Sequence, residues 1–133
     1  MSPFTRPPPL SVGAEVRVVA ASSPFDRARY QVGSALLRER YTLREGSALF
    51  ERCGFLAGAD ERRLADLRAA LADPAVAAIV PPRGGYGATR LLPSLHVEEV
   101  RRAGKWLVGF SDVTALHALW ARAGLCSIHG PMV

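Results

Sequence analysis

The sequence predicts an α/β domain with an open parallel β-sheet and helices on both of its faces. Short runs of apolar, β-branched residues alternate with amphipathic segments of helical period, which is the pattern of repeated strand–helix units. The chain has 133 residues, 49% apolar and 22% charged, which fits one domain with its own hydrophobic core. No apolar run reaches 18 residues, so no membrane-spanning helix is expected.

The first strand–helix unit occupies the beginning of this pattern. Residues 16–21 are β-branched and apolar, which predicts a buried strand. A helix is expected over 26–40, with Ser23 or Asp26 near its start, and a short strand over 41–44. The apolar positions of this helix are Val32, Ala35, Leu36 and Leu37.

A loop over 50–58 leads to the second unit. Asp60 opens a helix in which Leu64, Leu67 and Leu71 recur at helical spacing. The charged run at its start, Asp60-Glu61-Arg62-Arg63, is interpreted as a solvated face. Asp73-Pro74 ends the helix, and 76–80 is a second buried strand.

The remaining units follow the same alternation. A short helix begins at Ala88 and is limited by Pro93, and the last long helix ends before Gly124, which suits its C′ position. The elements expected in this part are helices over 88–92, 97–103 and 113–123, with strands over 106–110 and 126–129.

Charge and cysteine content exclude several classes of function. The net charge is +5, but the basic residues are scattered and interleaved with acids, so no nucleic-acid surface is expected. Cys53 and Cys126 lie far apart and in no metal-ligand spacing, which predicts reduced thiols and no metal site. Residues 1–13 are expected to form a flexible proline-rich tail rather than a signal peptide, so the cytoplasm is the predicted location.

Two loops at the carboxyl ends of strands carry the candidate chemistry, because ligands of parallel sheets bind at that edge. The first is Arg83-Gly84-Gly85-Tyr86-Gly87, whose glycines allow positive φ and close backbone approach. Its N–H groups are suited to an anion or an oxyanion. The alternative is a flexible tight turn, and no lysine follows as a phosphate-binding P-loop requires.

The second loop, Gly109-Phe110-Ser111-Asp112, joins a buried strand to a helix. A sharp turn there would expose Ser111 at a helix N-terminus, as in a nucleophile elbow, with the Asp112 N–H positioned to stabilise an oxyanion. The alternative is that Ser111 or Asp112 merely caps the helix.

These loops occur together with further motifs that resemble the LD-carboxypeptidase (muramoyltetrapeptide carboxypeptidase) family of serine peptidases. The resemblance extends from about Ala14 to Val133. The matching stretches are the strand that ends in Ser22-Ser23-Pro24, the segment from residues 54–58 through Asp73-Pro74, and residues 83–87, 109–116 and 129–132.

The resemblance implies a flavodoxin-like or class I glutamine-amidotransferase-like sheet and a Ser–His–Glu hydrolase without metal or cofactor. Ser111 would be the nucleophile, with an oxyanion hole from the Asp112 N–H and the Gly84-Gly85 region. Arg83 and Tyr86 would line the substrate groove. The implied substrate is a murein tetrapeptide, from which the terminal D-alanine is removed in cell-wall recycling.

In the family the His and Glu partners come from a C-terminal domain, so residues 14–133 are expected to form only the nucleophile-bearing domain, inactive or nearly inactive alone. His117 lies about 9 Å along the helix from Ser111 and on another side, which excludes it as the base. His96 follows a different strand, and His129 is the one geometric candidate. Apolar residues such as Met132 and Val133 are expected to be exposed and to cause self-association, for example as a homodimer.

Three alternatives stay open at this point. A microcin-immunity-type peptidase, which cleaves an aminoacyl-nucleotide, resembles the same motifs. A non-catalytic module would hold a peptide carboxylate in the glycine loop. A truncated product would have no independent role.

Overall fold

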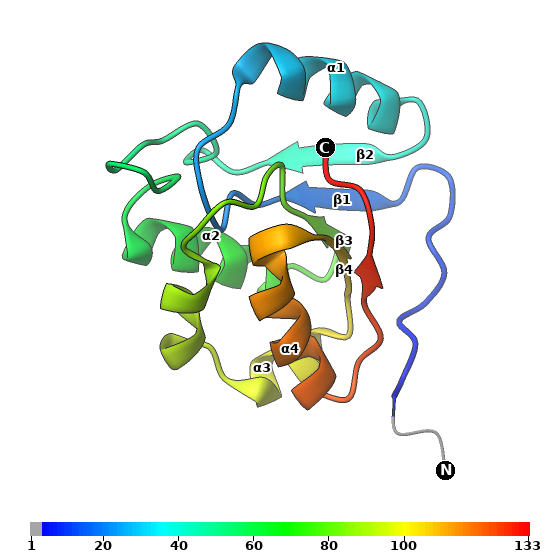
Figure 1. Ribbon diagram of the computed structural model, residues 1–133. Helices are drawn as coiled ribbons and strands as arrows, with labels where there is room; N and C mark the ends of the chain where they lie inside the picture. Colours follow the sequence, from blue (N-terminus) through cyan, green and yellow to red (C-terminus); the bar gives the residue numbers. More distant parts are fainter. Residues whose placement is uncertain (1–3) are drawn as a thin grey trace.

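The computed structural model, which describes residues 4–133, has a five-stranded parallel sheet at its centre (Figure 1). The strand order is β2-β1-β3-β4-β5, so the chain reverses its direction of travel between β1 and β3. Such a switch point opens a crevice at the carboxyl ends of the two strands. The strands are β1 (Glu15–Val18), β2 (Thr42–Glu45), β3 (Val76–Val80), β4 (Trp106–Gly109) and β5 (Ile128–His129).

Helices cover the two faces of the sheet unequally. Helix α1 lies on one face, over β1 and β2, whereas α2, α3 and α4 lie together on the other (Figure 1). This division follows from right-handed crossovers, because only the β1–β2 connection runs toward that edge of the sheet. The bounds are α1 (Arg27–Arg38), α2 (Asp60–Ala72), η1 (Ala88–Ser94), α3 (Val97–Ala103), η2 (Ser111–Val113) and α4 (Thr114–Arg122), where η marks a 3₁₀ helix.

The predicted fold class is confirmed, and most elements appear where the sequence places them. The helix expected over 88–92 is the 3₁₀ helix η1, which contains Pro93. Gly124 adopts φ +75° directly after Ala123, the C-cap of α4, as its predicted C′ position requires. Asp26 caps α1, since its Oδ1 accepts a hydrogen bond from the Arg29 N–H at 2.8 Å. None of the helices described is long and apolar enough to cross a membrane.

The main hydrophobic core lies between the sheet and the three-helix face. Trp120 is fully buried there, and its indole N–H donates to the Lys105 carbonyl at 2.8 Å. The other large side chains that are fully buried in this core include Leu67, Ile79, Leu91, Leu107 and Leu116. This continuous apolar cluster fixes the loops that enter and leave α2, η1 and α4.

The opposite face is held by smaller clusters and by the ends of the chain. Residues 4–10 are docked on the domain rather than free: Thr5 exchanges backbone hydrogen bonds with Gly124 and Cys126, and the Trp106 indole donates to the Pro8 carbonyl at 2.8 Å. Met1–Pro3 lie outside the described residues. Val133 packs on the same face as Leu10.

Burial of α1 and of the last residues does not follow the apolar pattern of the sequence, and the expected exposure of Met132 and Val133 is wrong. In α1 the apolar Val32 and Leu36 are 69% and 64% exposed, while Tyr30 and Ser34 are buried instead. Nothing in the described residues covers the outer side of α1, so an apolar position there has no partner. Val133 is half-buried because the last residues pass close to α1. The approach is so close that a Cβ on Gly33 of α1 would lie 2.8 Å from the Val133 carbonyl carbon. Met132, also half-buried, packs against the main core.

Candidate active site

Three loops meet at the carboxyl edge of the sheet, after β1, β3 and β4. They are the segment after β1 that contains Ser23, the glycine loop (residues 83–87), and the serine turn (residues 109–112). The glycine loop contacts both of the others, because a Cβ on Gly84 would touch Ser111 and a Cβ on Gly85 would clash with the Ser23 Oγ. The two loops singled out by the sequence are therefore neighbours in space.

Ser111 has a backbone conformation that non-glycine residues rarely adopt. Its φ is +61°, and it is the one non-glycine residue with positive φ among residues 4–133. Its side chain is exposed, and neither η2 nor α4 has a side-chain N-cap, so the helix-cap alternative is wrong. Gly109 permits the sharp turn, since a Cβ there would lie 3.0 Å from Val113 Cγ1. Strained residues of this kind cluster at functional sites.

Gly84 lies directly against Ser111 and Asp112. A Cβ at Gly84 would be 2.9 Å from the Ser111 Oγ and 3.1 Å from the Asp112 backbone N. Within residues 4–133, the N–H groups of Gly84, Gly85 and Asp112 have no hydrogen-bond acceptor. Unused backbone donors next to an exposed hydroxyl are the elements of an oxyanion hole.

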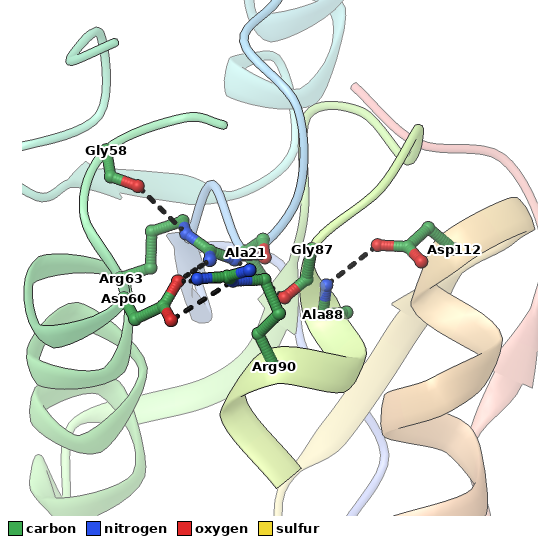
Figure 2. A network of polar contacts seen from close by, with 8 residues as sticks. All are labelled: Ala21, Gly58, Asp60, Arg63, Gly87, Ala88, Arg90 and Asp112. Carbon is green, nitrogen blue, oxygen red and sulfur yellow. Dashed lines mark hydrogen bonds and ion pairs between the residues drawn. The ribbon is translucent and has the colours of Figure 1, made fainter. Parts of the chain in front are cut away.

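Side chains from two other loops anchor the glycine loop. The Ser23 Oγ accepts a hydrogen bond from the Tyr86 N–H at 3.0 Å, and the Ser23 N–H donates to the Gly84 carbonyl at 3.1 Å. The Asp112 carboxylate accepts from the Ala88 N–H at 2.8 Å (Figure 2). The loop is thus fixed in place, which does not fit a flexible turn.

Arg63 supports the exit of the glycine loop from the side of α2 (Figure 2). Its side chain is 1% exposed and donates to the carbonyls of Ala21, Gly58 and Gly87, the last at 2.9 Å. It also pairs with Asp60, which binds Arg90 as well. The hydrogen bond from Arg90, joined by that from Arg63, holds the pKa of Asp60 below its usual value. The interpretation of Arg63 as part of a solvated face is therefore wrong.

The two remaining predicted residues lie at the rim of the site. Arg83 is exposed and donates to the Pro24 carbonyl at 2.6 Å. Tyr86 is 48% exposed, with its ring 5.7 Å from that of Phe55. A cavity of about 420 Å³ opens beside Arg83; its lining includes Phe25, Arg29 and Pro82.

The His117 side chain has partners other than Ser111. Its Nδ1 lies 2.7 Å from the Oγ of Ser127, just before β5, and its Nε2 lies 2.8 Å from the Gly109 carbonyl at the end of β4. His129 is exposed, with its ring near those of Phe110 and His117. His96 precedes α3. In the part of the chain described, no histidine hydrogen-bonds to Ser111.

Sequence reasoning missed Ser23, Arg63 and the side-chain role of Asp112. Helical period held a signal for Arg63, since the buried positions of α2 are Arg63, Leu67, Ala70 and Leu71. An arginine in that register faces the core, where its charge is tolerated only if acceptors are supplied for it. Ser23 lies in the Ser22-Ser23-Pro24 stretch of the family resemblance, but no pattern in the sequence indicates that its hydroxyl holds the glycine loop.

Comparisons with known proteins agree with this geometry. A family model described as the LD-carboxypeptidase N-terminal domain matches residues 16–130. A putative carboxypeptidase of Streptomyces coelicolor is 44% identical over 138 residues, which cover 99% of this chain and 44% of that protein.

Solved structures give the same result in three dimensions. An MccF-like protein of Bacillus anthracis superposes with a TM-score of 0.88 at 28% identity, covering 96% of this chain and 40% of that one. A muramoyltetrapeptide carboxypeptidase of Oxalobacter formigenes superposes with a TM-score of 0.81 at 28% identity, covering 89% and 40%. The chain thus spans about two fifths of the length of these relatives.

Proposed function

Because the chain belongs to the LD-carboxypeptidase family, we propose that it supplies the nucleophile of a serine peptidase that removes the terminal D-alanine from a murein tetrapeptide. The observation that carries the proposal is the pairing of Ser111, exposed at φ +61°, with unused N–H groups at Asp112 and Gly84. A strained serine beside convergent donors is the arrangement that acyl transfer requires.

In the proposed reaction, the Ser111 Oγ attacks the carbonyl carbon of the bond before D-alanine. The carbonyl oxygen becomes an oxyanion that accepts hydrogen bonds from the Asp112 N–H and from the Gly84-Gly85 segment. The C–N bond breaks as the serine proton passes, through a base, to the leaving amine of D-alanine. Water then hydrolyses the acyl-enzyme, releasing the tripeptide and regenerating the serine.

The base in this mechanism would come from outside the 133 residues. The His117 ring nitrogens are held by Ser127 and Gly109, and the His129 ring contacts aromatic neighbours. We therefore propose that a C-terminal domain supplies the His and Glu, as the family resemblance implies. A serine without its base loses most of its catalytic power, so the chain alone should show negligible turnover.

Arg83 and Tyr86 are the proposed contacts of this chain with the substrate. Both are exposed at the rim of the site, and Arg83 still has guanidinium N–H groups beyond the one bound to Pro24. A guanidinium suits a substrate that carries several carboxylates. The proposal places the protein in the cytoplasm, which is supported by the free thiols of Cys53 and Cys126.

A fusion protein tests the proposal. The region of the Oxalobacter formigenes enzyme that superposes on this chain is replaced by the chain, and D-alanine release from murein tetrapeptide is measured. We expect turnover that Ser111→Ala lowers by about 10⁴-fold, whereas Ser11→Ala, an exposed serine outside the site, leaves it unchanged. A folded fusion without turnover, or full turnover with Ser111→Ala, would refute the proposal. Robust turnover by the 133-residue chain alone would refute its dependence on a second domain.

A microcin-immunity-type peptidase is the second candidate, favoured by the TM-score of 0.88 with the protein similar to MccF, which is a microcin C7 self-immunity protein. An aminoacyl-nucleotide offered to the same fusion distinguishes the two, because the preferred substrate has the higher kcat/KM. A binding module would instead retain the tetrapeptide without turnover, and Ser111→Ala would not change its affinity.

A further inference from the structure

The peptide bond between Gly87 and Ala88 is held at both ends by charged side chains of opposite sign. At one end, Arg63 Nη1 donates to the Gly87 carbonyl oxygen at 2.9 Å. At the other, the Ala88 N–H donates to the Asp112 carboxylate at 2.8 Å (Figure 2). Among residues 4–133 every peptide bond is trans, so the C=O and N–H of this unit point in opposite directions. A cation and an anion therefore lie along one peptide dipole.

This arrangement is built into the fold rather than left to a mobile surface pair. Arg63 is buried, and each nitrogen of its guanidinium has an acceptor, which is what a buried charge needs to be tolerated. Gly87 adopts φ +128°, and a Cβ there would lie 2.9 Å from Arg63 Nη1. The absence of a side chain at position 87 is thus what lets the guanidinium approach the peptide.

Asp112 links this peptide to the reactive residue, because it directly follows Ser111 in the chain. Its carboxylate holds Ala88, while its backbone N–H stays unused next to Ser111 and Gly84. Rotating the Gly87–Ala88 peptide would break the carboxylate contact and free the side chain of Asp112. The glycine loop would then no longer fix the orientation of the Asp112 N–H.

We propose that Arg63 is a positioning residue that acts through the Gly87–Ala88 peptide and Asp112 to fix the geometry of the oxyanion donors at Ser111. Hydrogen bonds to charged groups are the stronger ones, and bonds in a chain polarise one another. The consequence for turnover rests on the proposed function, whereas the coupling of Arg63 to Asp112 does not.

Hydrogen exchange of the ¹⁵N-labelled chain measures the coupling without substrate. Arg63→Lys keeps the charge but loses the planar guanidinium, so the Ala88 amide should exchange about tenfold to a hundredfold faster. The amides of β3 should keep their protection. Arg62→Lys is the matched control, since Arg62 is the neighbouring arginine on α2, is 52% exposed and pairs with Glu51. This control should change neither the exchange rate of the Ala88 amide nor the protection of the β3 amides. Equal acceleration of all amides, or an unchanged Ala88 amide, would overturn the proposal.

A second variant covers the case in which Arg63→Lys does not fold. Asp112→Asn lies at a half-buried position and removes the charge that Ala88 contacts. We expect faster exchange at Ala88 and a shifted Arg63 Nε–H resonance, although the two side chains are joined only through the peptide. An unshifted Arg63 signal would overturn the proposal.

The fusion protein adds the catalytic readout. Arg63→Lys should lower kcat by about tenfold with KM nearly unchanged, because oxyanion donors act mainly in the transition state. A change confined to KM, or no change, would overturn the catalytic role. If the unmodified fusion is inactive, the proposed function fails, while the exchange experiment still decides whether Arg63 and Asp112 are coupled.

Discussion

The glycine loop and the serine turn lie against each other but are stabilised in different ways. The glycine loop is held by side chains from outside it, namely Ser23, Arg63 and Asp112. The serine turn is shaped largely by its own backbone, with Ser111 at φ +61° and Gly109 packed on Val113, although His117 also contacts the Gly109 carbonyl. The loop that would bind the oxyanion is thus fixed by a polar network, while the residue that would react stores the strain.

This difference separates the effects that substitutions should have. A side chain added in the glycine loop should lower activity, because it would press against Ser111. Relieving strain in the serine turn should raise stability. Removing charge beneath the glycine loop should change the response to acid.

The largest effect is expected at Gly84. Gly84→Ala would place a methyl group 2.8 Å from Ser111 Cβ and 2.9 Å from its Oγ, in the space that the oxyanion must occupy. We expect kcat of the fusion protein to fall by about a hundredfold or more. Gly54→Ala is the control for replacing a loop glycine without a steric clash, because nothing lies within 4 Å of the added Cβ. Equal losses for the two variants would show that contact with Ser111 is not the cause.

The next effect concerns stability and distinguishes two substitutions at one position. Ser111→Gly should raise the free energy of unfolding by about 1 kcal/mol, since glycine adopts positive φ without the steric cost of a Cβ. Ser111→Ala keeps the Cβ and should give no such gain. Urea unfolding of both variants measures the difference. If Ser111→Gly is no more stable than Ser111→Ala, the turn is not strained.

The smallest effect depends on pH and concerns the charges beneath the glycine loop. The hydrogen bond from Arg90, with that from Arg63, lowers the pKa of Asp60 from its ordinary 3.8. Because the folded-state pKa is the lower one, the stabilisation is present above about pH 3.8 and is lost as pH falls through the folded-state pKa.

Asp60→Asn should therefore remove part of the acid dependence of unfolding, measured by circular dichroism between pH 6 and 2. Glu61→Gln, at an exposed position in the same turn of α2, is the control and should keep the slope of the unmodified chain. Identical slopes for Asp60→Asn and the unmodified chain would contradict the role of this ion pair.

The sequence predicted the fold well where apolar patterning and burial coincide. The strand at Val76–Val80 has the predicted bounds, and four of its five residues are buried. Helix α1 shows where the pattern fails, since Val32 and Leu36 are apolar but exposed. Periodicity identifies a helix, but which side is covered depends on segments distant in the chain.

The site was predictable to the extent that its chemistry is local. Ser111, Asp112 and the glycines lie in short motifs, and the structure brings them together. The supports are not local: the Arg63 side chain reaches Ala21 and Gly87, which lie 42 and 24 residues away. Helical period marks Arg63 as a position on the buried side of α2, but it does not identify the carbonyls that accept its hydrogen bonds, so its role emerges only from tertiary contacts.

Trapping the acyl-enzyme tests the central claim most directly. The fusion protein is mixed with murein tetrapeptide, quenched in acid during turnover, digested and mapped by mass spectrometry. The account predicts an adduct with the mass of the acylating tripeptide on the peptide that contains Ser111, absent from Ser111→Ala. Turnover in which no adduct forms on that peptide, or an adduct on another residue that survives Ser111→Ala, would contradict it.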